Sequence, residues 1–94
     1  MAMGQVLKFP GGTMAQYDAV SEELGIKGDQ GWPDGVITHA AGSTDDGFVV
    51  IESWESEDAW NKFFESRLQP AFEKVGGIPQ PSVTRFEVQN SYQA

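Results

Sequence analysis

The sequence contains no cysteine and only one histidine, His39. Without cysteine the chain has no disulfides and no thiolate metal ligands to stabilise it. A zinc site would have to combine His39 with scattered carboxylates, which falls below the usual ligand count for zinc. We therefore expect no metal site, and we expect packing alone to stabilise the fold.

Basic residues and long apolar runs are also scarce. Six Lys and Arg side chains stand against 14 Asp and Glu, a net charge of −8. Such a chain lacks the basic surface that binding to nucleic acid or to an anionic membrane requires. Its longest apolar run, residues 48–51, is far shorter than the roughly 20 residues of a membrane span. The first residues do not resemble a signal peptide, so we expect a cytoplasmic protein.

The length of 94 residues predicts a single domain over residues 1–94 with a small core. Apolar residues nevertheless make up 39% of the chain, and three Trp, two Tyr and six Phe are among them. This is more apolar surface than a small monomer core needs. A second copy of the chain could cover the excess, which favours a homodimer.

Two helices are predicted from their N-terminal signals. Thr13 and Gln16 have the spacing of a capping box, and Gly25 suits the left-handed residue that ends such a helix. Ser56 is predicted to cap a second helix, which should kink or restart at Pro70.

Four strands are predicted around these helices, at residues 5–9, 36–41, 48–54 and 82–89, with Val83, Phe86 and Val88 contributing to the core. The order β-α-β-β-α-β is that of the ferredoxin-like α+β fold, an antiparallel four-stranded sheet with two helices on one face. Residues 36–37 and 48–51 are apolar on both sides of their strands, so the uncovered face of the sheet also needs a partner.

His39 is the default general acid or base, because its unperturbed pKa lies near neutrality; the alternative is a packed histidine. Glu52 interrupts an apolar strand, either as an exposed or partner-paired carboxylate or as a functional one, with a raised pKa or a role in orienting His39. If Gly42 pairs with Gly47 in the hairpin, His39 shares a face with Glu52 and Trp54. If Gly42 pairs with Phe48, these two residues lie on the opposite face from His39.

Several aromatic residues have two interpretations. Trp54, Trp60 and Phe64 fit a packed core, and they also fit the wall of an aromatic substrate cavity. Tyr17 either occupies the rim of the first helix or directs its hydroxyl into that cavity. Trp32, in a loop rich in Gly and Pro, either plugs one end of the core or contacts a ligand.

The chain resembles the dimeric α+β barrel proteins, and more narrowly those similar to the antibiotic biosynthesis monooxygenases. The residues that carry the resemblance are GVITH at 35–39, Asp46-Gly47 in the hairpin, and WESEDAWNKF at 54–63. The resemblance implies that two sheets associate into a closed barrel with the helices outside. It also implies one of several activities, because some members oxidise aromatic polyketides without metal or flavin, whereas others bind or degrade haem or isomerise lactones.

Two functional hypotheses follow. In the first, the protein is a monooxygenase-like enzyme without a cofactor that acts on a small aromatic or polyketide-like molecule. His39 is then the catalytic base, and Tyr17, Glu52, Trp54, Trp60 and Phe64 bind substrate. In the second, the protein is a non-catalytic binding or structural dimer, and His39 is packed. Haem-degrading relatives carry their axial histidine on a helix, and the predicted helices here contain none, which argues against that activity.

Overall fold

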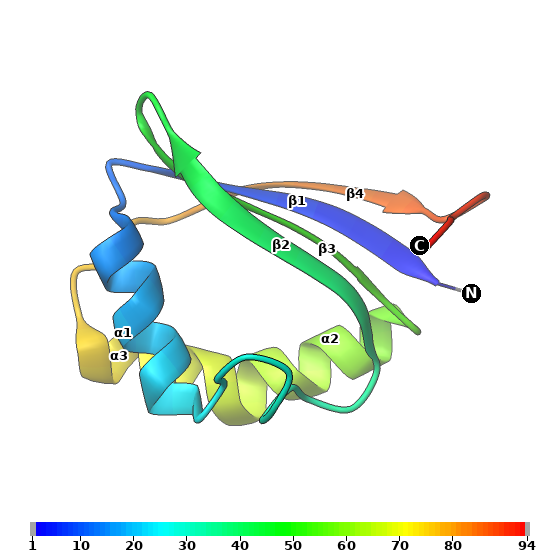
Figure 1. Ribbon diagram of the computed structural model, residues 1–94, viewed down its shortest axis with the longest axis horizontal. Helices are drawn as coiled ribbons and strands as arrows, with labels where there is room; N and C mark the ends of the chain where they lie inside the picture. The colour runs from blue at the N-terminus through cyan, green and yellow to red at the C-terminus, as the bar shows by residue number, and fades with distance from the viewer. Residues whose placement is uncertain (1, 94) are drawn as a thin grey trace.

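The computed structural model describes residues 2–93. The elements follow the order β1 (Met3–Pro10), α1 (Met14–Leu24), β2 (Val36–Thr44), β3 (Gly47–Trp54), α2 (Glu57–Phe63), η1 (Phe64–Leu68), α3 (Gln69–Val75) and β4 (Ser82–Glu87). The strands form one antiparallel sheet in the order β2-β3-β1-β4. All helices lie on the same side of this sheet (Figure 1). The predicted ferredoxin-like α+β fold is confirmed.

Helix α1 begins and ends as the sequence predicts. The Thr13 hydroxyl accepts from the backbone N–H of Gln16, and the Gln16 side chain accepts from the backbone N–H of Thr13, which completes the capping box. At the other end Gly25 has φ of +75°, a conformation that side chains with a Cβ seldom adopt. These caps place Tyr17 in the first turns of α1, on the side that packs against the sheet.

The second helical unit runs through α2, η1 and α3, and Ser56 caps its start as predicted. The middle segment η1 is a π-helical turn, and Pro70 lies in the first turn of α3. The first turn of a helix tolerates Pro because its backbone N–H groups have no partner within the helix. The predicted restart at Pro70 therefore takes the form of a new helix that follows a widened turn.

The hairpin between β2 and β3 is longer than predicted. Thr44 pairs with Gly47 across the two-residue turn Asp45-Asp46, and Gly42 pairs with Val49. Both predicted pairings of Gly42 were therefore wrong. The observed register differs by two residues from the first of them, so each side chain stays on the face that this pairing assigned.

The core fills the space between the inner face of the sheet and the helices. Its buried members are Met3, Leu7, Phe9, Phe48, Val50, Trp54, Trp60 and Phe63. In β1 and β3 these residues alternate with more exposed ones, as expected for strands with one covered face. The single chain thus buries one face of its sheet.

No helix in the described residues 2–93 lies over the outer face of the sheet (Figure 1). Ile51 on this face is 52% exposed, and Phe86 is 51% exposed with its ring over Gly4. Val83 lies on the inner face of the sheet and is nevertheless 45% exposed, so the prediction that Val83 and Phe86 belong to the core was wrong. Val88, the third predicted core residue, follows the end of β4 and is half-buried. Strand β4 lies at the edge of the sheet, where a single chain offers few residues to cover it. Within residues 2–93 no helix is long and apolar enough to cross a membrane.

Candidate functional site

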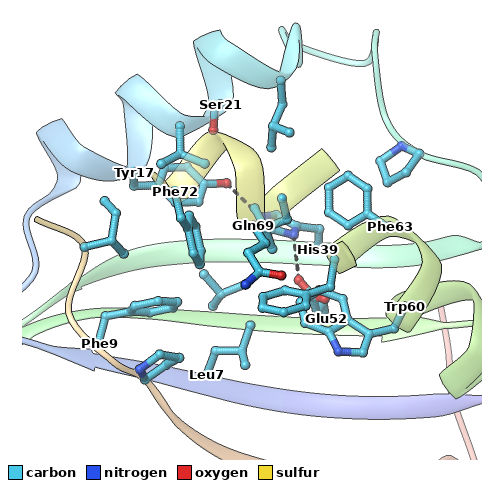
Figure 2. A pocket seen from close by; sticks show the side chains of 18 of the residues that line it. Leu7, Phe9, Tyr17, Ser21, His39, Glu52, Trp60, Phe63, Gln69 and Phe72 are labelled. Carbon is cyan, nitrogen blue, oxygen red and sulfur yellow. Dashed lines mark hydrogen bonds and ion pairs between the residues drawn. The ribbon is translucent and has the colours of Figure 1, made fainter. Parts of the chain in front are cut away.

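A cavity of about 640 Å³ lies between the inner face of the sheet and the helices. Most of its wall is apolar and aromatic, and Figure 2 shows how these side chains converge on a small polar group. The size and lining match those of sites that bind small organic molecules. The aromatic lining comprises Phe9, Tyr17, Trp32, Phe48, Trp54, Trp60, Phe63, Phe64 and Phe72.

His39 lies on the wall of this cavity, directly opposite Glu52 in the β2–β3 pairing. Its Nδ1 is 3.2 Å from Glu52 Oε1, and the ring is largely enclosed. The pair therefore shares the inner face of the sheet with Trp54. Of the two faces that the sequence left open for Glu52, the structure has the one shared with His39, so Glu52 can orient His39.

Glu52 is buried, with 5% of its surface exposed. A buried carboxylate is expensive unless donors surround it, and Glu52 has three. His39 faces Oε1, while Oε2 accepts from Gln5 Nε2 at 2.9 Å and from the indole N–H of Trp54. The predicted alternative of an exposed carboxylate is wrong, because Glu52 is held from three sides.

Tyr17 approaches His39 from α1, with its hydroxyl 2.7 Å from Nε2 (Figure 2). Burial raises the pKa of the Tyr17 phenol, the negative charges of Glu52 and Asp18 raise it further, and the Ser21 hydroxyl acts in the opposite direction. Tyr17 is therefore a neutral donor at neutral pH. When the Nδ1–H group donates to Glu52, Nε2 carries no proton. It then accepts a hydrogen bond from the Tyr17 hydroxyl.

Two polar residues extend the group on the other side of Glu52. Gln5 is completely buried, and its Oε1 accepts from Arg85 Nε at 3.0 Å. Gln5 was not predicted as a site residue, although the sequence contains a signal for it. In β1 the buried positions Met3, Leu7 and Phe9 are apolar, and Gln5 interrupts them as Glu52 interrupts β3.

The remaining predicted site residues, Trp54, Trp60 and Phe64, also line the cavity. Trp60 and Phe64 lie on the helical wall, with ring centroids 5.6 Å apart. Trp54 is 2% exposed and packs on Trp60, so it belongs to both the core and the wall. The structure thus brings all six predicted residues to one cavity, with only His39, Tyr17, Glu52 and Trp54 in the polar group.

Trp32 and Gln69 complete the surroundings of His39. The Trp32 ring centroid lies 4.8 Å from that of His39, and its indole N–H donates to the Gly28 carbonyl at 2.9 Å. Trp32 therefore packs directly beside the imidazole instead of only closing one end of the core. Gln69 reaches into the cavity from α3 (Figure 2). Gln69 lies far along the chain from the other site residues, and no sequence pattern marked it as part of the site.

The arrangement suits proton transfer. A neutral imidazole held by a carboxylate at Nδ1 presents Nε2 as a base, and apolar walls around it keep water away from the reacting atoms. Among residues 2–93 no three His, Asp or Glu side chains are placed to hold a metal ion together.

No family model matches the sequence, and no curated protein is similar to it at a significant level. Solved structures with the same fold do exist. Rv0793 from Mycobacterium tuberculosis matches with a TM-score of 0.72 and 15% identity, over 99% of this chain and 100% of that one. SnoaB, a cofactor-independent oxygenase from Streptomyces nogalater, matches with a TM-score of 0.67 and 15% identity, over 96% and 95% of the two chains.

A third structure is a monooxygenase from the gene ActVA-Orf6 of Streptomyces coelicolor, solved with nanaomycin D. Its TM-score is 0.59 with 21% identity, over 99% of this chain and 91% of that one. The predicted resemblance to antibiotic biosynthesis monooxygenase-like proteins is therefore confirmed as a likeness of fold over nearly the whole chain. Identities this low carry no activity from one protein to another.

Proposed function

We propose that the protein is a cofactor-independent, monooxygenase-like enzyme that acts on a small aromatic or polyketide-like molecule. The observation that carries the proposal is His39 on the wall of an aromatic cavity of about 640 Å³, with Nδ1 held by the buried Glu52. Two proteins of the same fold, SnoaB and the ActVA-Orf6 protein, are an oxygenase and a monooxygenase, which supports the reaction class.

In the proposed reaction His39 Nε2 removes a proton from a phenolic or enolic substrate. Glu52 stabilises the imidazolium that forms, because its Oε1 faces Nδ1. The electron-rich substrate anion then reacts with dioxygen. For an activated CH₂ group, the carbon loses two hydrogens and gains one oxygen atom as a carbonyl, and the second oxygen atom leaves as water. The substrate itself supplies the electrons.

Tyr17 and the aromatic walls have the supporting roles. The Tyr17 hydroxyl donates to Nε2, so the substrate hydroxyl either displaces it or reaches His39 through it. Trp60 and Phe64 contact the flat faces of the substrate. Trp54 donates a hydrogen bond to Glu52 and closes the floor of the cavity. Planar apolar walls suit a planar aromatic ligand and exclude water from its anion.

We further propose that the active form is a homodimer joined through the outer face of the sheet. Ile51 and Phe86 expose about half of their surfaces there, on the sheet face that no helix within residues 2–93 covers. A second copy presents the same apolar face, as a two-fold interface requires. The pairing closes two sheets into a barrel and leaves both cavities on the helical sides.

The test is oxygen consumption with a panel of planar phenols and anthrone-like compounds, with products identified by mass spectrometry. His39→Ala should lower turnover by roughly 10²–10⁴-fold, the usual contribution of a general base, with little change in melting temperature. Lys62→Met, an exposed change on α2, serves as the matched control. Binding without turnover in the wild type would instead identify a non-catalytic binding module. A large loss of stability in His39→Ala, without any activity to lose, would identify a packed histidine.

A further inference from the structure

Four polar side chains form one row across the whole sheet. His39 on β2 pairs in register with Glu52 on β3, Glu52 pairs with Gln5 on β1, and Gln5 pairs with Arg85 on β4. Each neighbouring pair is in contact through its side chains, at 3.2 Å, 2.9 Å and 3.0 Å in turn. The row therefore connects the cavity histidine to an arginine on the edge strand.

The donor and acceptor groups of these side chains determine the direction of each hydrogen bond along the row. The guanidinium of Arg85 can only donate, so the side-chain oxygen of Gln5 faces Arg85 and its NH₂ group faces Glu52. Glu52 must then act as an acceptor toward Gln5 and the Trp54 indole, and it remains an acceptor toward His39. An acceptor at Nδ1 requires the proton of the neutral imidazole to be there, which makes Nε2 the unprotonated nitrogen that accepts from the Tyr17 hydroxyl.

We propose that Arg85 is a positioning residue that sets the tautomer of His39 through Gln5 and Glu52. Arg85 contributes in two ways. It fixes the orientation of the fully buried Gln5 amide, and it is the only permanently charged donor on the row, so its hydrogen bond to Gln5 is stronger than one between neutral groups.

The other contact of Arg85 does not replace this role. Its Nη1 lies 3.4 Å from Glu57 Oε1, in a pair whose side chains are 38% and 61% exposed. Such an exposed pair contributes little, and it leaves Nε directed at Gln5. Glu57 thus helps to hold the guanidinium at the sheet edge without competing for the donor that orients Gln5.

The inference deepens the site on which the proposed function rests, but its test does not need turnover. Nitrogen-15 NMR of the folded protein, at a pH where the wild-type imidazole is neutral, distinguishes the two tautomers of its only histidine. We expect the wild type to carry the proton on Nδ1. Arg85→Met should reduce this population in favour of the Nε2–H tautomer or the doubly protonated ring. Arg85→Lys, which keeps a donor and a positive charge, should restore part of it.

Gln5→Met provides the second variant, because it interrupts the row and leaves Arg85 in place. It should shift the tautomer in the same direction, and the double variant should shift it no further, as expected for residues that act in series. Lys62→Met, which removes an exposed positive charge from the last turn of α2, should leave the wild-type spectrum unchanged. An unchanged tautomer in both Arg85→Met and Gln5→Met would overturn the proposal, as would an equal shift in Lys62→Met.

If the protein turns over a substrate, Arg85→Met should lower kcat while KM changes little, because Arg85 acts through the base. A tautomer shift in a protein without turnover would support the positioning role and reject the proposed reaction. Turnover with an unchanged tautomer would support the proposed reaction and reject the positioning role of Arg85.

Discussion

Tyr17 is held in its neutral form by its surroundings, and this has a consequence for stability at alkaline pH. Its folded-state pKa is raised, chiefly by burial, above the ordinary value of about 10. The folded state thus binds the phenolic proton more tightly than the unfolded state does. The stabilisation is complete below about pH 10 and is lost as the pH rises through the folded-state pKa. We expect the free energy of unfolding to fall more steeply above about pH 10 in the wild type than in Tyr17→Phe.

Urea unfolding at a series of pH values measures this difference. Tyr92→Phe is the matched control, because Tyr92 is 90% exposed. That variant should follow the wild-type pH dependence. Equal slopes for the wild type and Tyr17→Phe would show that the phenol is not perturbed in the folded protein.

Gln5 provides a second test at the scale of one residue. Its side chain is fully buried between Glu52 and Arg85, so Gln5→Met keeps the volume but removes one hydrogen bond from each of these two charged partners. A hydrogen bond to a charged group contributes about 1.5–3 kcal/mol, and we expect the free energy of unfolding to fall by about that amount. The measurement is again urea unfolding, compared with Gln30→Met in an exposed turn. Equal effects of the two substitutions would contradict the structural importance of the row.

The site could be predicted from the sequence only in part. His39 stood out because it is the only histidine, and Glu52 because it breaks an apolar strand. Whether the two residues meet depended on the hairpin register, which differs by one residue between the two arrangements that the sequence allowed. Gln5 was missed because a neutral amide in a strand predicts no chemistry until its partners are known.

At the scale of elements, features that depend on neighbours in the sequence were predicted more reliably than features that depend on contacts between distant segments. The capping box at Thr13 and the left-handed Gly25 involve neighbours within one turn of helix, and both were predicted correctly. Strand β4 was expected to supply core residues because Val83 and Phe86 are apolar. Its position at the sheet edge depends on contacts with β1, nearly 80 residues earlier in the chain, and sequence alone does not reveal how many layers cover that edge.

The capping box leads to a prediction for α1. Thr13→Ala removes the hydroxyl that accepts from the Gln16 amide, and such substitutions cost about 1 kcal/mol. Thr13→Ser keeps the hydroxyl and should stay close to the wild type. Thermal unfolding followed by circular dichroism compares the two. A loss in Thr13→Ser as large as that in Thr13→Ala would assign the effect to packing of the Thr13 methyl group.

At the scale of the whole molecule, the exposed sheet face determines the expected assembly. Ile51→Lys would place a charge at the centre of an apolar interface, where it has no partner. We expect size exclusion with light scattering to give a dimer for the wild type and a monomer for this variant. Lys27→Glu, an exposed change in the loop after α1, is the control and should remain a dimer. A wild-type monomer at micromolar concentration would contradict the proposed interface.

The polar row also restricts how the sheet can fold. Each of the three strand pairings contains one of its contacts, so each pairing has a single register in which its polar groups meet. A slip of two residues keeps every side chain on its face, and an apolar strand alone would accept it with little penalty. Here the same slip leaves a buried charge or amide unpaired. The row therefore selects against misaligned sheets, and we expect paired two-residue insertions or deletions within the strands to be tolerated far less well than changes of length at the Asp45-Asp46 turn.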